Sequence, residues 1–243
     1  MVHTLEEFAA AFQEIQRMGW VQTHRSGPTG VGKTLEDLLG IPENNHNLPD
    51  FGDYELKSCR INSPSMLTMF TCAPLPQGAN TNLLQKFGYP SGACGNGERI
   101  LHATLSARRF TPIGPAGHQL RLICRPEGIF IASEAGIENV HWPRERLKKA
   151  FERKYRGKLV YAKAMARGRN SAEEFRYTEA YEVSGFCYDA LLSLLEKGKV
   201  YADLRIGQYH SGPNRGKTHD HGTAFRIREE DQHLLFRKVR QIA

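Results

Sequence analysis

The sequence predicts a mixed α/β fold of the α+β kind, and three observations support this. Apolar residues recur at helical spacing near the N-terminus, in residues 5–18. From residue 53 onwards, short runs alternate between apolar and polar residues and are bounded by Gly, Pro and Asn, as strands are. The 243 residues are 40% hydrophobic and 24% charged, which is ordinary for a globular protein able to bury its own core.

The N-terminal segment is predicted to be a helix. Thr4 and Glu7 have the spacing of a capping box, in which each side chain bonds to the backbone N–H of the other residue. The helix is expected to end at Gly19. Its apolar residues are expected to face the core, and they are Leu5, Phe8, Phe12, Ile15 and Met18.

The rest of the chain is predicted to be largely extended. Residues 20–33 are expected to form a loop, followed by a short helix from near Thr34 to Gly40. Residues 74–117 are rich in Gly, Pro and Asn, and only one strand is expected there. A basic helix with Pro143 at its first position should cover residues 143–157, and another helix residues 186–199. The predicted strands are residues 53–59, 65–72, 100–106, 118–125, 128–134, 158–166, 174–185, 200–210 and 218–227.

Composition narrows the class of protein. The net charge of +7 suits a polyanionic partner such as nucleic acid. An odd number of scattered cysteines without a C-x-x-C pair predicts free thiols in a reducing cytosol, and argues against disulfides or a cysteine-based zinc site. With no apolar run of ~20 residues and no visible secretory signal, we expect a cytoplasmic protein. The cysteines are Cys59, Cys72, Cys94, Cys124 and Cys187.

Residues 27–34 match the phosphate-binding pattern G-x-x-x-x-G-K-[ST] in full. Such a loop must connect a buried strand to a helix, whose N-terminus and backbone N–H groups then hold the phosphates. Residues 21–26, which precede it, are polar and basic rather than apolar. Glu36 and Asp37 are expected in the first turn of the following helix, where they would compete with phosphate for the helix dipole. A nucleoside triphosphatase is therefore disfavoured.

A second constellation points to different chemistry. Asp50 follows Pro49 in a predicted turn, and Glu55 and Lys57 lie two residues apart on a predicted strand. Side chains alternate across a strand, so Glu55 and Lys57 should share one face while Leu56 points into the core. Two carboxylates can hold Mg²⁺ and a lysine can stabilise a pentavalent phosphate, which together make a phosphodiesterase site.

Alternatives remain open at this motif. The residues around Glu55 could simply be an exposed strand face, because such short motifs are degenerate. Asp53 lies on the same predicted face and could replace Asp50 as a ligand. Glu36, on the short helix upstream, would be a further carboxylate directed at the same metal.

Three blocks of the sequence resemble the MvaI/BcnI family of type II restriction endonucleases, relatives of the nicking enzyme MutH in the PD-(D/E)XK superfamily. They are residues 29–57, 65–106 and 202–227, and the third block is the most specific. Residues 110–180 match weakly. In this family a Gly-rich segment like residues 29–34 precedes the first acidic helix, so the resemblance implies that the phosphate-loop match is coincidental.

The resemblance implies a catalytic set of Glu36, Asp50, Glu55 and Lys57. The three carboxylates would bind Mg²⁺, for which Mn²⁺ would substitute. The implied reaction is hydrolysis of a phosphodiester bond in double-stranded DNA, leaving 5′-phosphate and 3′-hydroxyl ends. The implied fold is a restriction-endonuclease-like, MutH-like core plus a second, DNA-recognition lobe, the two forming a cleft.

The expected lobes belong to a single nuclease domain covering residues 1–243. The catalytic lobe is predicted to comprise residues 1–75 and 115–170. The recognition lobe is predicted to comprise residues 76–114 and 171–243.

The third block is interpreted as the recognition module. On the strand of residues 200–210, Asp203, Arg205 and Tyr209 are expected to point away from the core. Arginine suits the O6/N7 edge of guanine, and aspartate can accept from the N4 amine of cytosine. Family members read short C/G sites of the CCNGG type. The resemblance adds the DNA-facing residues His219, His221 and Arg226, and phosphate contacts are expected from Lys33, Arg215 and Lys217.

Other functions stay open at this point. His210, His219, Asp220 and His221 could form a zinc site, although two spaced ligand pairs are not evident. The basic residues of 143–157 could be a solvated helix face rather than a DNA contact. The leading hypothesis is a monomeric restriction enzyme that nicks the two strands in succession and has a cognate DNA methyltransferase as its functional partner. The alternatives are a MutH-like nicking repair enzyme and a DNA-binding module that has lost its nuclease site.

Overall fold

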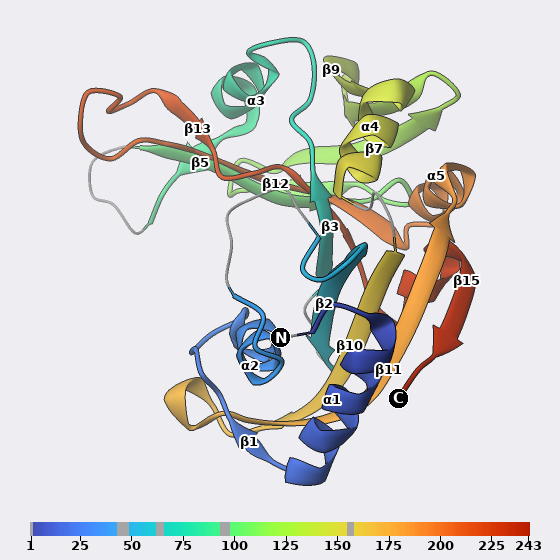
Figure 1. The fold of residues 1–243 in the computed structure, drawn as a ribbon. Helices are drawn as coiled ribbons and strands as arrows, with labels where there is room; N and C mark the ends of the chain where they lie inside the picture. Colours follow the sequence, from blue (N-terminus) through green and yellow to red (C-terminus); the bar gives the residue numbers. More distant parts are fainter. Residues whose placement is uncertain (1, 43–48, 62–65, 93–97, 155–157) are drawn as a thin grey trace. The chain divides into compact units, whose positions relative to one another are not determined.

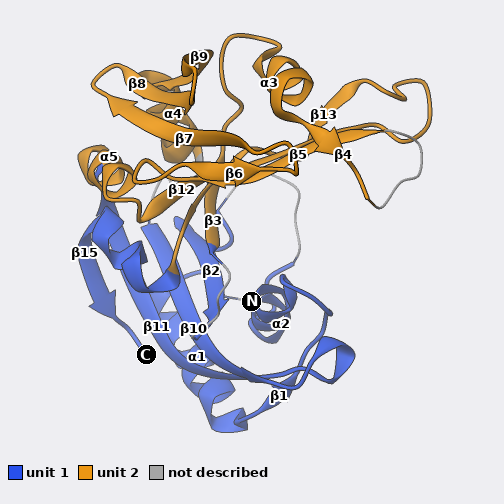
Figure 2. Cartoon of the chain, turned by 180° about the vertical axis from the view of Figure 1, so that it is seen from behind, with its two compact units in different colours: residues 1–66, 154–187, 229–243 blue, residues 67–153, 188–228 orange. Residues whose placement is uncertain are grey.

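The computed structural model describes the chain except for residues 1, 43–48, 62–65, 93–97 and 155–157 (Figure 1). The chain divides into two compact units, each assembled from separate stretches of sequence (Figure 2). Unit 1 contains residues 1–66, 154–187 and 229–243, and unit 2 contains residues 67–153 and 188–228.

Unit 1 is built around a five-stranded sheet. β2 (Tyr54–Arg60) runs parallel to β10 (Lys158–Arg167), and β10 forms a long antiparallel hairpin with β11 (Glu174–Phe186). β1 (Val21–Gln22) and β15 (Phe236–Gln241) both pair antiparallel with β11, at its two ends. The predicted strands of residues 53–59, 158–166 and 174–185 are thereby confirmed to within two residues at each end.

Helix α1 (Leu5–Met18) begins with the predicted capping box. The Thr4 hydroxyl accepts a hydrogen bond from the Glu7 backbone N–H, and the Glu7 carboxylate accepts one from the Thr4 backbone N–H, both at 3.2 Å. The helix ends at Gly19, whose φ of 74° suits a residue without Cβ. Met18 is 58% exposed, so its predicted place in the core is wrong; it is the last residue of the helix.

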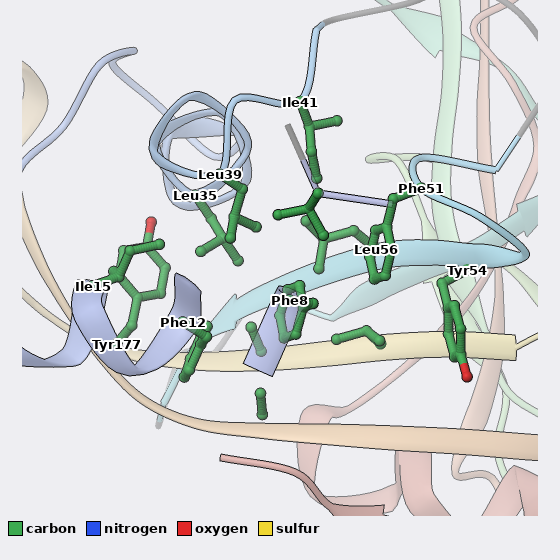
Figure 3. Packing of buried hydrophobic residues seen from close by; sticks show 14 of the residues in the cluster. Phe8, Phe12, Ile15, Leu35, Leu39, Ile41, Phe51, Tyr54, Leu56 and Tyr177 are labelled. Carbon is green, nitrogen blue, oxygen red and sulfur yellow. The ribbon is translucent and has the colours of Figure 1, made fainter. Parts of the chain in front are cut away.

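The core of unit 1 joins α1, α2 (Gly30–Leu38) and β2 (Figure 3). The Phe8 ring stacks on that of Phe51 at 5.4 Å, and the Phe12 ring meets the edge of Tyr177 on β11 at 6.2 Å. Leu56 of β2, only 4% exposed, belongs to the same cluster. Burial of these apolar side chains therefore fixes the strand that carries the predicted catalytic residues.

Helix α2 begins at Gly30 rather than near Thr34. Two bonds support its early turns: the Tyr177 hydroxyl donates to the Val31 carbonyl at 2.8 Å, and the Thr34 hydroxyl accepts from the His24 N–H at 2.9 Å. Glu36 and Asp37 therefore do not lie in its first turn, and the dipole argument made from sequence is wrong. Residues 30–34 are helical, with the Lys33 N–H bonded to the Thr29 carbonyl, so this segment does not form a phosphate loop.

Unit 2 contains a six-stranded and a four-stranded sheet, both antiparallel. The strands of the six-stranded sheet are β3 (Leu67–Thr71), β14 (Ala224–Ile227), β12 (Val200–Gln208), β5 (Arg99–Leu105), β4 (Tyr89–Pro90) and β13 (Thr218–Asp220). The other sheet is a meander of β6 (Thr111–Ile113), β7 (His118–Arg125), β8 (Gly128–Ser133) and β9 (Gly136–Pro143). The helices of this unit are α3 (Ala79–Phe87), α4 (Arg144–Lys154) and α5 (Tyr188–Glu196).

Several predicted elements of unit 2 need correction. The Gly- and Asn-rich segment 74–117 contains α3, β4 and β6 in addition to the predicted strand. Pro143 ends β9 instead of beginning α4. The predicted strand 218–227 is two strands, β13 and β14, because Asp220 accepts a hydrogen bond from the Gly222 N–H and turns the chain between them.

The two units also divide the chain differently from the predicted lobes. Residues 171–187 belong to unit 1, because β11 pairs along its length with β10. Residues 115–153 belong to unit 2, where the meander is bonded to the end of β5 through the Leu122 N–H and the Ser106 carbonyl, at 2.9 Å. Residues 67–75, predicted in the catalytic lobe, belong to unit 2 through β3. Residues 229–243, predicted in the recognition lobe, belong to unit 1 through β15.

Two predictions about composition can be compared with the structure. The four cysteines that the structure describes are free thiols, as predicted: Cys59, Cys72, Cys124 and Cys187. Cys94 lies outside the described residues. No helix among the described residues is long and apolar enough to cross a membrane.

Candidate active site and recognition face

Strand β2 places Glu55 and Lys57 on one face of the unit 1 sheet, as its alternation predicts. Both side chains are partly exposed, with side-chain exposures of 18% and 29%, while Leu56 between them is in the core. The Lys57 ammonium donates to Glu55 Oε1 at 2.5 Å and to the Leu56 carbonyl at 3.3 Å. A carboxylate and an ammonium group thus lie in direct contact at the surface of the sheet.

Asp50 joins these two residues through the backbone. Its Oδ2 accepts a hydrogen bond from the Leu56 N–H at 2.6 Å. A tight turn brings it there: Phe51 and Tyr54 form an isolated antiparallel bridge, with Gly52 at a φ of 49° inside the turn. The Asp50 carboxylate therefore contacts the peptide unit that links Glu55 to Leu56. Asp53, the alternative ligand considered from sequence, is exposed, and its carbonyl accepts from the Lys158 N–H.

Glu36 comes from α2, which packs against β2. A Cβ added at Gly32 would lie 3.4 Å from Ser58 Oγ and 3.8 Å from Glu36 Oε1, so the small residue allows a close approach of helix and strand. Ser58 shares a sheet face with Leu56, not with Glu55 and Lys57. Among the residues that the structure describes, no group of three acidic, His or Cys side chains that could hold a metal ion is found. The assignment of Glu36 as a third ligand therefore stays a prediction.

The sequence analysis missed a residue that ties these elements together. Arg60, at the end of β2, makes two hydrogen bonds to the Glu173 carboxylate, at 2.6 and 2.8 Å. The same guanidinium donates to the carbonyls of Gly27 and Pro28, both at 2.9 Å, and lies 5.0 Å from the centroid of the Phe175 ring. Arg60 thus holds the segment before α2 against the end of β2. Only tertiary contacts reveal this role.

Lys33 lies on α2, one turn before Asp37. Its ammonium bonds to Asp37 Oδ1 at 2.7 Å, and His24 Nδ1 lies 3.0 Å from Asp37 Oδ2. The hydrogen bond from Lys33 is the main reason why the pKa of Asp37 is below its ordinary value. Lys33 is therefore paired with a carboxylate, not held over a phosphate loop.

The predicted recognition residues of unit 2 centre on Asp203 of β12. Its Oδ2 accepts from Arg205 Nε at 2.8 Å and lies 3.1 Å from Arg226 Nε, while Oδ1 accepts from the Thr104 hydroxyl at 2.7 Å. The Arg226 contact is an ion pair without good hydrogen-bond alignment. Burial is the main reason why the pKa of Arg226 is lowered, with Asp203 opposing it.

Asp203 differs from its prediction. It shares the sheet face of Arg205 and Arg226, as expected, but it is only 6% exposed because these two side chains and Thr104 surround it. Arg205 remains 48% exposed at its side chain and Arg226 18%. The outermost groups on this face are consequently guanidinium groups that a buried carboxylate orients.

Three aromatic rings extend the same face toward the hairpin between β12 and β13. Tyr209 and His219 lie 4.4 Å apart between ring centroids, and His219 and His221 lie 4.2 Å apart. Burial, followed by the neighbouring His219 and His102, lowers the pKa of His221. The structure thus brings Tyr209, His219 and His221 together.

The hairpin tip carries Arg215 and Lys217. The Tyr209 N–H bonds to the Lys217 carbonyl at 3.0 Å, and the Gly216 N–H bonds back to the Tyr209 carbonyl at 2.9 Å, which closes the loop. The residues of the alternative zinc site have other partners: His210 contacts Glu98, and Asp220 accepts from Asn80 at 2.7 Å. This geometry favours two exposed cations at a hairpin tip over a zinc site.

Comparison with known proteins decides the family. A family model described as the MvaI/BcnI restriction endonuclease family matches residues 9–236. The chain belongs to the MvaI/BcnI restriction endonuclease family. It is accordingly a type II site-specific endonuclease with a restriction-endonuclease-like, mixed α+β fold, and the resemblance drawn from the sequence is confirmed.

Two solved structures extend this similarity over the whole chain. The restriction endonuclease MvaI in complex with its cognate DNA substrate is 33% identical, with each chain covered in full and a TM-score of 0.81. MvaI in the absence of DNA is also 33% identical, covering 100% of this chain and 99% of the other with a TM-score of 0.65. Comparison with curated protein sequences gives no match.

Proposed function

We propose that this enzyme binds double-stranded DNA at a short C/G site of the CCNGG type and hydrolyses one phosphodiester bond in each strand with Mg²⁺. The observation that carries the proposal is the contact of Asp50 with the Leu56 N–H, between Glu55 and Lys57. It puts two carboxylates and one ammonium group around three consecutive residues, Glu55, Leu56 and Lys57. Phosphodiester hydrolysis needs such a combination, because negative charge must be both held and neutralised.

The donor set fits a magnesium ion. Asp50 and Glu55 offer carboxylate oxygens, the ligands that a hard divalent cation prefers. When bound, the metal would acidify a water and stabilise charge on the scissile phosphate, and Mn²⁺ would serve as a substitute. We assign Glu36 as the third carboxylate, from α2.

Lys57 acts on the nucleophile and the transition state. Its ammonium already lies at Glu55, and from there it can orient the attacking water and neutralise the pentavalent phosphate. The products would be 5′-phosphate and 3′-hydroxyl ends. Unit 1 is therefore proposed as the catalytic part of the molecule.

Unit 2 is proposed as the recognition part. Arg205 is exposed and held by Asp203, so it is suited to the O6/N7 edge of guanine, and Arg226 to a neighbouring contact. Tyr209, His219 and His221 would approach the DNA beside them. The Asp203 carboxylate could accept a hydrogen bond from the N4 amine of cytosine. Lys33, Arg215 and Lys217 would contact phosphates, which position the duplex but carry no sequence information.

We further propose that the enzyme is a monomer in the cytosol of a prokaryote. A monomer with one active site must nick the two strands in succession, by rebinding the near-palindromic site in the opposite orientation. Its host would need a cognate DNA methyltransferase to protect its own sites. The resemblance to MutH that the sequence suggests leaves one second candidate, an enzyme that nicks one strand and stops.

The decisive experiment incubates the protein with plasmid DNA and Mg²⁺, with EDTA as the control, and sequences the ends. Discrete fragments that share one short site support the proposal. Open circles that persist at high enzyme concentration support the nicking enzyme instead. Retarded but uncut DNA would mean a binding module without nuclease activity, and would overturn the proposed reaction.

A further inference from the structure

A second basic surface lies in unit 2, outside the residues assigned to recognition. A cavity of about 520 Å³ is lined on one side by α4 and on the other by residues 71–75. Arg146, Lys149 and Arg153 line it from α4. Their spacing of three and four residues puts them on one face of the helix, one above the other. Glu145 also lines the cavity.

These three cations are available for an external anion. Arg146 Nε donates to the Ala73 carbonyl at 3.1 Å, which fixes its position at the mouth of the cavity. Among the residues that the structure describes, none of the three forms an ion pair with a carboxylate. Two other cations of α4 do so: Arg144 pairs with Asp189 at 2.9 Å and Lys148 lies 3.9 Å from Glu152.

The cavity lies on the other side of the six-stranded sheet from Arg205 and Arg226. Helix α4 packs through Phe151 against Phe70 at 5.6 Å, and Phe70 stacks on Phe225 at 5.0 Å. Phe225 and Arg226 are neighbours on β14, and neighbours on a strand point to opposite faces. Because the two surfaces lie on opposite sides of the sheet, the stretch of duplex that contacts Arg226 cannot also contact the α4 cavity.

We propose that Arg146, Lys149 and Arg153 bind the phosphate backbone of a second segment of duplex DNA while the recognition face holds the first. This inference rests on the proposed function, which assigns the first duplex to the recognition face. From Arg146 to Arg153 the helix rises roughly 10 Å, at 1.5 Å per residue. One DNA strand presents a phosphate about every 3.4 Å along its axis, so that length spans about three phosphates for three cations.

The residue types of this surface suit phosphate groups. Two guanidinium groups can each bind a phosphate through paired N–H donors, and the lysine adds a point charge between them. No base edge is contacted, so binding to this surface is independent of sequence. The enzyme would thereby hold one segment of a long DNA while it tests another, which speeds transfer between distant sites.

The test uses two labelled duplexes in EDTA, so that neither is cut. One carries the cognate site and a fluorescent donor, and the other lacks the site and carries an acceptor. The wild-type protein is expected to give energy transfer between them. The triple variant Arg146→Gln, Lys149→Gln, Arg153→Gln should lose at least ten-fold in affinity for the acceptor duplex. Acceptor binding by the wild type should fall with salt at a log–log slope of roughly −2 to −3, for three phosphates.

A matched control removes the same charge from unit 2 outside α4, through Arg109→Gln, Arg125→Gln and Lys197→Gln, which are exposed. It should keep energy transfer. Lys149→Glu alone provides a second test if the triple variant does not fold, and should weaken transfer by itself. Equal loss in the control, no loss in the α4 variants, or displacement of the acceptor duplex by polyglutamate at matched charge would overturn the inference.

The outcome is separable from that of the proposed function. Cleavage of a short cognate duplex in Mg²⁺ should be the same for the wild type, the α4 variant and the control. Absence of cleavage by the wild type would overturn the proposed function. Intact cleavage without energy transfer would overturn only the proposal of a second DNA-binding surface.

Discussion

Arg60 and Glu173 form two parallel hydrogen bonds, Nε to Oε1 at 2.6 Å and Nη2 to Oε2 at 2.8 Å. Both side chains are mostly buried, at 19% and 12% exposure. The remaining donors of Arg60 hold the carbonyls of Gly27 and Pro28, so one guanidinium joins β2, the approach to α2 and the start of β11. This ion pair therefore adds to the hydrophobic core in holding the strand of Glu55 and Lys57 beside the segment that leads into the helix of Glu36.

Replacing Arg60 with alanine should lower both stability and cleavage. Removal of one partner leaves Glu173 without its counter-ion, which costs about 2–5 kcal/mol in a mostly buried pair. Urea unfolding measures that loss, and a double-mutant cycle with Glu173→Ala should recover part of it. Arg167→Ala is the matched control, because its pair with Glu174 is more exposed, and its stability should change little. Equal losses at Arg60 and Arg167 would contradict the role assigned to Arg60.

Lys57→Ala should abolish cleavage while DNA affinity is largely kept. The lysine is assigned to the transition state, and interactions made only there affect the rate rather than ground-state binding. Gel shifts in EDTA and cleavage of a short duplex in Mg²⁺ measure the two quantities separately. Lys158→Ala, at the start of the neighbouring strand β10, should remain active. Full activity of the Lys57 variant would falsify the assigned active site.

Arg205→Ala should relax discrimination at one base pair. A guanidinium directed at a guanine edge contributes about 1–3 kcal/mol to the preference for that base. Affinities for a panel of duplexes, each changed at one position, measure this preference. Arg215→Ala is the contrasting variant and should lower the affinity for all duplexes by a similar factor. A uniform loss for Arg205→Ala would make it a phosphate contact instead.

Cys59 should make the protein less stable in alkali. Burial raises the pKa of its thiol from an ordinary 9.0 to about 11. Below pH 9 the thiol is protonated in both states; between pH 9 and 11 only the unfolded chain releases the proton, so stability falls as pH rises. The slope from one thiol is at most about 1.4 kcal/mol per pH unit. Urea midpoints from pH 8 to 10 should fall less steeply for Cys59→Ala, and parallel curves would contradict the prediction.

Local patterns predicted much of the fold. The capping box at Thr4 and Glu7, and the alternation of Glu55, Leu56 and Lys57, depend on neighbouring residues and are visible in the sequence. Strand β15 was missed because five of its six residues are exposed and it lacks an apolar pattern; it exists through pairing with β11. The early start of α2 was missed for a similar reason, since distant residues, including Tyr177, support its first turns.

The candidate site shows the same limit. The types of residue and their spacing indicated Asp50, Glu55 and Lys57, and the turn at Gly52 gives Asp50 its contact with β2. The burial of Asp203 was not predicted, because it depends on Thr104 and Arg226, which come from other strands. Arg60 was missed for the same reason, since its partner is 113 residues away.

The chain passes back and forth between its two units, and the sheet that bears Glu55 and Lys57 takes strands from three stretches of the polypeptide. Cutting the gene at any single point therefore cannot yield an independent nuclease half, and a ribosome must finish β15 before β11 has all its partners. Folding requires contacts between residues far apart in the sequence, so it is expected to be slower than that of proteins of equal size whose contacts are mostly local. A fragment lacking the last strand would leave the edge of β11 open to association with other chains.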